Sequence, residues 1–197
     1  MRFIGDIHGD MDKYLELIKG CENSIQVGDF GAGFVPLPDP ANLPLCHKFI
    51  RGNHDSPYCC RLSSHWIKDG TWDELHKMMF IGGAYSIDQN WRTPMISWWP
   101  DEELSYEELS GLISEYDFRK PEVMVTHDCP DSIRQHFFRI HESTKTSAAL
   151  QSMFEIHKPK LWIFGHHHRF KNEIIKGTRF ICLGIDETCD IDIKEKI

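Results

Sequence analysis

Residues 5–9 read Gly5-Asp6-Ile7-His8-Gly9 and directly follow an apolar run, Met1 to Ile4. Four further stretches carry residues that can bind metal ions, and most of them also close an apolar run. They are Gly28-Asp29, Gly52-Asn53-His54-Asp55, Thr126-His127-Asp128 and Gly165-His166-His167-His168, and the runs before them are 24–27, 48–50, 123–125 and 161–164. Such runs predict buried strands of a parallel or mixed sheet, whose ligand sites collect at the carboxyl ends of the strands. We therefore expect the five stretches to meet at one edge of the fold.

The side chains in these stretches suit divalent metal ions. Carboxylates, imidazoles and an amide oxygen are borderline-to-hard donors, which zinc, manganese, iron and nickel accept. Two carboxylates, one amide and four histidines exceed what one tetrahedral or octahedral ion uses. The ligand inventory predicts a pair of metal ions.

The order of the five stretches resembles the calcineurin-like metallophosphoesterase superfamily, whose pattern is D-x-H, GD, GNH with an acid, a lone His, and GH-x-H. Here the blocks read GDIHG, VGDFG, RGNHD, VTHDC and IFGHHH, and they extend from Gly5 to His168. Each block alone is weak, whereas all five in order are specific. The resemblance implies an α/β fold, an αββα four-layer sandwich with two mixed β-sheets flanked by helices.

The resemblance also implies roles for single residues. One metal would be bound by Asp6, His8, Asp29 and His168, and the other by Asp29, Asn53, His127 and His166, so that Asp29 bridges both. Manganese is the expected metal, and iron, zinc, nickel and magnesium are alternatives. A hydroxide between the two metals would attack the phosphorus of a phosphate ester. His54 would be the general acid, and Asn53, His54 and Arg51 would bind the substrate.

Spacing within the blocks adds expectations about side-chain direction. Asp6 with His8, and His166 with His168, are two residues apart, so both members of a pair would project to one side of an extended segment. His167 would then face away and be structural. We expect a carboxylate, Asp55 or Asp128, to favour the protonated form of His54. Cys129 is expected to be a small apolar filler rather than a lining of the site.

Departures from the pattern bear on the substrate. Protein phosphatases of this superfamily read GD-x-x-DRG at the second block, and their acid and phosphate-binding arginine would fall at Ala32 and Gly33. Arg51 could replace that arginine. A dianionic monoester loses more from this absence than a diester, which favours a phosphodiesterase. A protein phosphatase is the alternative, and an inert scaffold with this fold is a third hypothesis, disfavoured because every ligand position is filled.

The segment from Trp91 to Glu103 is rich in tryptophan and acids. Its aromatic side chains could stack on a nucleobase, which makes a nucleotide-like ester a candidate substrate. Alternatively, Trp98 and Trp99 pack a long connection onto the sheet edge, with the acids facing water.

Composition sets outer limits. The 197 residues, 41% of them hydrophobic and 26% charged, predict a single globular metallophosphoesterase domain over residues 1–197. A net charge of -8 argues against an extended nucleic-acid surface. No signal peptide or membrane span is evident, and seven cysteines without a C-x-x-C pair predict reduced thiols, so a cytoplasmic location is expected.

The remaining elements follow from local patterns. Helices are predicted over 10–20, from the Ser105 capping box to about Tyr116, and over 144–157. A strand is predicted over 78–87, and a hairpin pairs 173–175 with 179–183. The stretch 31–44 is expected to be a loop because of Pro36, Pro38, Pro40 and Pro44.

Overall fold

The computed structural model describes residues 1–39 and 41–193. Pro40 of the predicted loop and residues 194–197 of the predicted domain lie outside the described residues. The strands are β1 Arg2–Ile4, β2 Ser24–Gln26, β3 His47–Phe49, β4 Trp72–Asp73, β5 Met78–Ile81, β6 Val123–Thr126, β7 Leu161–Phe164, β8 Lys171–Ile175, β9 Thr178–Cys182 and β10 Thr188–Asp190. The helices are α1 Met11–Leu17, α2 Pro57–Leu62, α3 Tyr106–Arg119, α4 Asp131–Phe138 and α5 Lys145–Ile156, with a 3-10 turn η1 at Gln89–Trp91.

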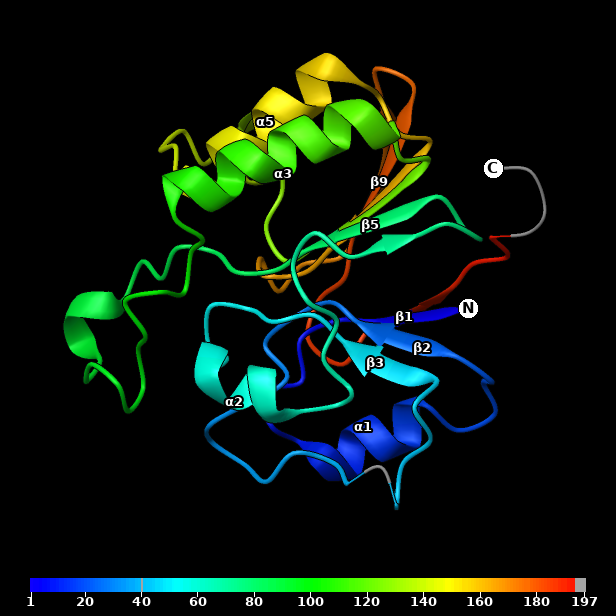
Figure 1. Ribbon diagram of the computed structural model, residues 1–197, viewed down its shortest axis with the longest axis vertical. Coiled ribbons are helices and arrows are strands. Elements are labelled where there is room, and N and C mark those ends of the chain that lie inside the picture. Colours follow the sequence, from blue (N-terminus) through cyan, green and yellow to red (C-terminus); the bar gives the residue numbers. More distant parts are fainter. Residues whose placement is uncertain (40, 194–197) are drawn as a thin grey trace.

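The strands form two mixed sheets. The smaller has the order β10-β1-β2-β3, and the larger has the order β4-β5-β6-β7-β9-β8. Strands β1, β2 and β3 are parallel, as are β5, β6, β7 and β9, whereas β10, β4 and β8 are antiparallel edge strands. The sheets lie between α3 and α5 on one side and α1 and α2 on the other (Figure 1). The predicted αββα sandwich is confirmed.

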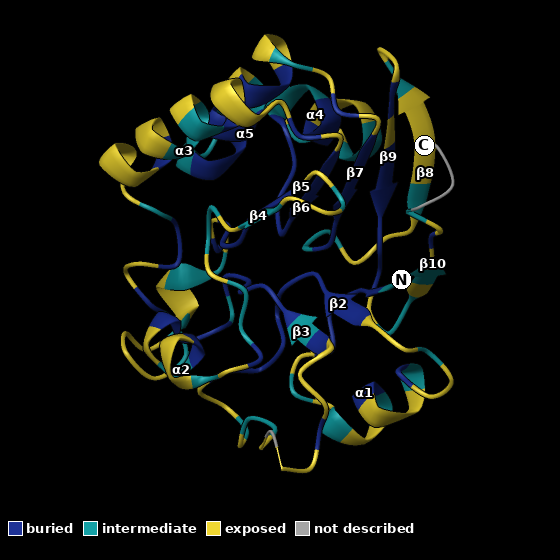
Figure 2. Cartoon of the chain, turned by 45° about the vertical axis from the view of Figure 1, so that its right-hand side comes forward, coloured by how far each residue is buried: buried dark blue, intermediate teal, exposed yellow. Residues whose placement is uncertain are grey.

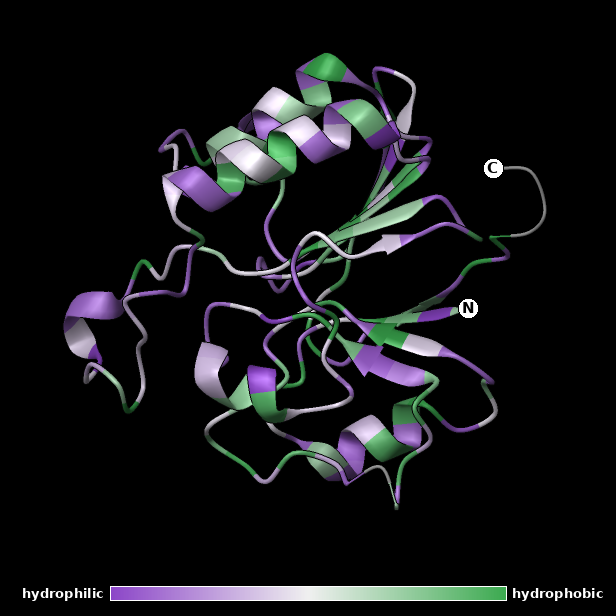
Figure 3. Cartoon of the chain, viewed as in Figure 1, coloured by the Kyte–Doolittle hydropathy of each residue, from purple (hydrophilic) through white to green (hydrophobic). Residues whose placement is uncertain are grey.

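Alternation along the strands builds the layers. In β5, Met78 and Phe80 join a cluster shared with Phe3 and Ile25 of the smaller sheet, so they face the other sheet. Met79 instead belongs to the cluster that packs against α3 and α5. Successive strand residues point to opposite faces, so a sheet covered on both sides needs apolar residues at every position. The central strands β5, β6 and β7 are accordingly buried and largely hydrophobic, whereas the edge strand β8 is mostly exposed, and many other exposed residues lie on the outer faces of the helices (Figures 2 and 3).

Helix boundaries follow their caps. The Ser105 capping box is confirmed, because the Ser105 side chain accepts from the Glu108 backbone N–H while Glu108 reaches back to the Ser105 backbone. The helix then continues past the predicted end at Tyr116 to Arg119, where Lys120 adopts a left-handed conformation with φ 49. The hairpin is also confirmed, with β8 beginning two residues earlier, at Lys171.

One local prediction needs correction, and two helices were missed. The strand predicted over 78–87 ends at Ile81, because the chain turns away at Gly83 (φ +79), whose N–H donates to the Arg51 carbonyl. Helices α2 and α4 were not predicted.

Within the part of the chain described, no helix combines the length and apolar character needed to cross a bilayer.

Candidate metal centre

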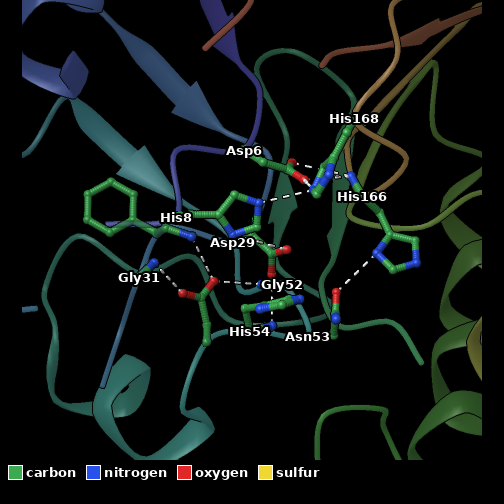
Figure 4. Close-up of polar contacts among 12 residues, drawn as sticks. Asp6, His8, Asp29, Gly31, Gly52, Asn53, His54, His166 and His168 are labelled. Atoms are coloured by element: carbon green, nitrogen blue, oxygen red, sulfur yellow. Dashed lines mark hydrogen bonds and ion pairs between the residues drawn. The ribbon is translucent and has the colours of Figure 1, made fainter. Parts of the chain in front are cut away.

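Side chains from both sheets meet beyond the ends of the parallel strands. Asp6 follows β1, Asp29 follows β2, Asn53 follows β3, and the loops after β6 and β7 carry the histidines (Figure 4). One ligand atom from each of four side chains lies within 4.8 Å of the others, and these are Asp6, His8, Asp29 and His168. The fold therefore collects at one place residues up to 162 positions apart in the sequence.

The backbone at these residues is left-handed rather than extended. His8, Asp29, His166 and His168 have φ values of 45, 58, 66 and 53. The expectation that the two-residue spacing acts through extended segments is therefore wrong. Non-glycine residues in this conformation carry strain that surrounding contacts must offset, and such residues cluster at functional sites.

The glycine before each of three ligand-type residues is required by space. A Cβ atom at Gly28 would lie 2.2 Å from His127 Nδ1, and one at Gly165 would lie 2.3 Å from Asp6 Oδ1. At Gly52 it would lie 2.0 Å from Asp29 Oδ1. In the GD, GNH and GH motifs, the glycine directly before the ligand-type residue therefore leaves space for a polar side chain from another motif.

The first group of side chains surrounds Asp6. His168 Nε2 lies 3.1 Å from Asp6 Oδ2 and 3.0 Å from His8 Nε2. The hydrogen bond to Asp6 raises the pKa of His168 although burial opposes it. Two imidazole nitrogens and a carboxylate oxygen therefore point at a common space.

The second group is centred on His127, whose tautomer is determined by its surroundings. His127 Nδ1 lies 2.9 Å from the Val27 carbonyl oxygen, so Nδ1 carries a proton and donates it. His127 Nε2 lies 3.0 Å from Asn53 Oδ1 and 3.4 Å from Asp29 Oδ1. His166 Nδ1 also lies 3.0 Å from Asn53 Oδ1. Nitrogen and oxygen atoms that converge in this way repel one another unless a proton or a metal ion lies among them, so these residues fit a metal ion.

The pKa values of His127 and Asp29 also show that positive charge is favoured between these two side chains. Burial lowers the pKa of His127, but the charge of Asp29 and its hydrogen bond outweigh burial and raise the pKa to about 10. Burial raises the pKa of Asp29, yet His127 reverses this effect and holds it well below its usual range. A metal ion would displace the proton from His127, because the ring nitrogen must be free to bind it.

Asn53 is oriented by two residues that the motifs do not include. Its Nδ2 donates to Ser86 Oγ at 2.9 Å, and Ser86 Oγ donates to Glu102 Oε2 at 2.5 Å. The Ser86 backbone N–H also donates to Glu102 Oε1 at 2.8 Å. With the amide nitrogen held by Ser86, the Asn53 carbonyl oxygen must face the histidines. Glu102 and Glu103 are buried, so the expectation that the acids of this segment face water is wrong for both.

Asp55 holds two of the loops together rather than assisting His54. Its Oδ1 accepts from the N–H groups of Gly31 and Ala32, and its Oδ2 accepts from those of Phe30 and Gly52. Asp128, the other candidate partner, lies 3.2 Å from His167 Nε2 and caps the Cys129 N–H. The expectation that Asp55 or Asp128 supports His54 is therefore wrong.

We expect Asp55→Asn to destabilise the fold strongly. The amide keeps one acceptor oxygen, so two of the four buried N–H groups lose their partner at about 1–3 kcal/mol each. Urea denaturation should show a lower midpoint with an unchanged slope, equivalent to roughly 2–5 kcal/mol. Asp190→Asn is the control, because its ion pair with Arg2 is largely exposed and should contribute less than about 1 kcal/mol. Equal shifts for the two variants would contradict this role of Asp55.

His54 lies at the edge of the cluster and faces an arginine. Its backbone N–H donates to Asp29 Oδ1 at 2.8 Å, and its ring lies 5.2 Å from the His8 ring. Arg92 Nη1 lies 2.8 Å from His54 Nδ1, and Arg92 Nη2 lies 3.0 Å from His54 Nε2. Burial lowers the pKa of His54; Asp29 acts against this effect and Arg92 adds to it. No motif signalled Arg92, which stands 38 residues away in the sequence.

Arg51 is committed elsewhere. Its Nε donates to Asp69 at 2.9 Å, and its Nη1 donates to the Glu102 carbonyl at 2.6 Å. The side chain is 3% exposed. The expectation that Arg51 binds the substrate phosphate is therefore corrected: Arg51 ties the connection after β5 to the domain.

The histidine and cysteine beside the cluster have structural surroundings. His167 stacks on Phe138 with ring centres 4.0 Å apart, and it contacts Asp128. Cys129 is fully buried in the cluster between the larger sheet and the helices. These positions agree with the structural role expected for each residue.

The tryptophan-rich connection has two faces. Trp99 is 4% exposed and packs edge-to-face on Phe34 at 5.2 Å, so it is buried as the packing alternative expects, but against the loop 31–44 rather than the sheet edge. Trp91 is 91% exposed, next to Arg92.

Gly33 has φ +96, and a Cβ there would lie 2.7 Å from Ser56 Cβ, so this position has no room for an arginine without rearrangement.

Two comparisons with known proteins found a similar fold and a matching family model, and a third found no match. The crystal structure of TT1561 of Thermus thermophilus has the same fold, with a TM-score of 0.53 and 14% sequence identity over 94% of this chain and 89% of that one. A comparison with curated proteins finds no significant match. A model of the calcineurin-like phosphoesterase family matches residues 2–170, which is most of the chain. This match includes all the motifs gathered at the strand ends, and the chain therefore belongs to the calcineurin-like phosphoesterase family.

Proposed function

We propose that this protein is a dinuclear-metal phosphoesterase that prefers phosphodiesters, nucleotide-like esters among them. The observation that carries the proposal is the convergence of six other ligand-type side chains around Asp29. Asp6, His8 and His168 approach it from one side. His127, with Asn53 and His166 beyond it, approaches from the other side.

Two divalent ions, one in each group with Asp29 between them, would supply Lewis-acid activation of water and charge neutralisation at the phosphoryl group. We propose manganese, because the donors are carboxylate and amide oxygens mixed with imidazoles. The chain itself orients these donors. The Val27 carbonyl sets the His127 tautomer, and Ser86 sets the direction of the Asn53 oxygen.

His54 is proposed to give a proton to the leaving oxygen. It is not among the residues assigned to either metal group, yet its backbone bonds to Asp29, so its ring stands beside the reacting phosphoryl group. Asn53, beside it, is proposed to help hold the substrate.

Two observations support the diester preference. The positions at which protein phosphatases place an acid and an arginine are Ala32, which is buried, and Gly33, where an added Cβ would lie 2.7 Å from Ser56 Cβ. In addition, a cavity of about 950 Å³ is lined by Tyr85 and Ile87, the sequence neighbours of Ser86, together with Tyr106, Ile140 and charged side chains such as Arg134 and Lys145. A diester has a second esterified group, and such aromatic and apolar side chains suit a nucleoside or another flat group.

A substrate panel tests the proposal. Bis-p-nitrophenyl phosphate, p-nitrophenyl phosphate, cyclic nucleotides and phosphopeptides would each be assayed with manganese, nickel, zinc and magnesium. We expect the highest kcat/KM on a diester with manganese, and complete, reversible loss on chelation. Higher kcat/KM on phosphopeptides than on any diester would favour the protein-phosphatase alternative. Metal-free protein without turnover of any ester would favour the scaffold hypothesis.

A further inference from the structure

Residues 85–103, within the connection from β5 to α3, form a flap that includes η1 and protrudes from the body of the molecule (Figure 1). The two ends of this flap are tied together. Ser86 bonds to Glu102 through both its backbone N–H and its hydroxyl. Arg51 holds the carbonyl oxygens of Asp101 and Glu102 at 3.3 and 2.6 Å. The flap therefore has a fixed base next to Asn53.

Arg92 is the residue that the flap directs at the site. Besides His54, its guanidinium contacts the Ser97 carbonyl oxygen at 3.1 Å and Asp88 Oδ2 at 2.7 Å. Its Nε is buried and has no hydrogen-bond partner among the described residues. Buried donors are normally satisfied, so a donor left over beside a candidate active site indicates a missing acceptor.

The contact with His54 cannot supply that acceptor. A neutral imidazole has one acceptor nitrogen and one N–H, so it cannot accept from Arg92 at both Nδ1 and Nε2. One arginine N–H therefore meets a ring nitrogen that already carries a proton. An anion that replaced this contact would accept hydrogen bonds from the guanidinium and from the ring N–H.

We propose that Arg92 binds a phosphoryl oxygen of the substrate, a role that the chain cannot place at Gly33. This inference rests on the proposed function. A guanidinium offers parallel donors that match two oxygens of a phosphate group. A diester keeps two non-bridging oxygens, which are enough for this contact, so Arg92 is compatible with the diester preference.

The ion pair of Arg92 with Asp88 leaves Arg92 able to bind a phosphate group instead. Its carboxylate side chain is 46% exposed, and its pair with Arg92 joins residues four apart on one turn. Such partly exposed pairs contribute little net stability, so Arg92 can exchange Asp88 for a phosphate without a large loss. The exchange would also release the Asp88 carboxylate to water.

The test compares Arg92→Gln, Arg92→Lys and the control Arg61→Gln. Arg61 is exposed on α2, where it lies 4.0 Å from Asp101 of the flap, so its substitution removes the same charge near the flap without touching His54. Binding of inorganic phosphate to the manganese-loaded proteins is measured by calorimetry, beside metal content and kcat/KM on bis-p-nitrophenyl phosphate. For Arg92→Gln we expect about 10–100-fold weaker phosphate binding and a similar loss in kcat/KM, with unchanged metal content. Arg92→Lys should restore part of the binding, and Arg61→Gln should match the wild type.

Repeating the comparison in the His54→Ala protein separates phosphate binding by Arg92 from positioning of His54 by Arg92. If Arg92 contacts the phosphate, Arg92→Gln weakens phosphate binding in the His54→Ala protein as well. Phosphate affinity that is unchanged by Arg92→Gln, or changed only while His54 is present, would overturn the inference and leave Arg92 as a positioning residue. A wild-type protein that loads metal but neither binds phosphate nor hydrolyses any ester would instead overturn the proposed function.

Discussion

Replacing Asp29 with asparagine is expected to remove at least one metal ion and nearly all activity. The two Asp29 oxygens face different groups: Oδ1 lies 3.4 Å from His127 Nε2, and Oδ2 lies 3.9 Å from His8 Nδ1. An amide can offer one neutral oxygen to one of these groups only. Because activation of water and charge neutralisation by the metals would supply much of the rate, kcat/KM should fall by at least about 10⁴-fold.

Elemental analysis of purified protein, combined with assays on a chromogenic diester, measures this effect. Wild type should carry up to two transition-metal ions per chain, and Asp29→Asn at most one, as follows from the two groups of ligands. Asp12→Asn, an exposed change in α1 that also removes one carboxylate, should retain both metals and full activity. Activity in thoroughly demetallated wild-type protein would refute the metal-dependent reaction.

His54→Ala is expected to keep both metals and to lower turnover by about 10²–10⁴-fold, the usual contribution of a general acid. The metal groups should survive because the link of His54 to Asp29 uses its backbone N–H, which alanine retains. The loss should be small for substrates whose leaving group is a weak base, such as nitrophenolate, and large for alkyl esters. This dependence is the signature of proton donation rather than of phosphate binding.

A series of diesters that differ in leaving-group pKa provides the measurement. His65→Ala is a suitable comparison for loss of an imidazole away from the site, because His65 is buried against the His47 carbonyl. An equal loss across the whole series would show that His54 positions the phosphate and donates no proton to the leaving group. Loss of metal from His54→Ala would also contradict the assignment.

Local sequence determined most of the elements that carry the site. Buried strands could be predicted where both faces of a sheet are covered, as in the apolar runs Met78–Ile81 and Leu161–Phe164, whereas the run before Asp29 contains the buried polar residues Ser24 and Gln26. A capping box predicted the start of α3, because its hydrogen bonds join residues three apart. Helix α2 had a readable signal that was missed, Ser56 at the N-cap followed by Pro57.

The direction of the ligand-type side chains was not determined locally. The prediction from spacing assumed an extended backbone at His8 and His168, whereas both residues are left-handed. Close approach of neighbouring loops imposes this conformation, as the space around Gly28, Gly52 and Gly165 indicates. No pattern within one block encodes contacts made by another block.

The sequence by itself determined the family, the order of the strands that carry the motifs, and the identity of the residues able to bind metal. Only the tertiary structure decided which side chains support them: Ser86 and Glu102 behind Asn53, Asp55 across two loops, and Arg92 against His54. The motifs can be recognised in the sequence because each block directly follows its own strand, so local residues set the position of its ligand-type side chains. Supporting contacts join residues that are 16 to 38 positions apart, and their partners are chosen by the packing of the two sheets and the flap, which no local pattern records.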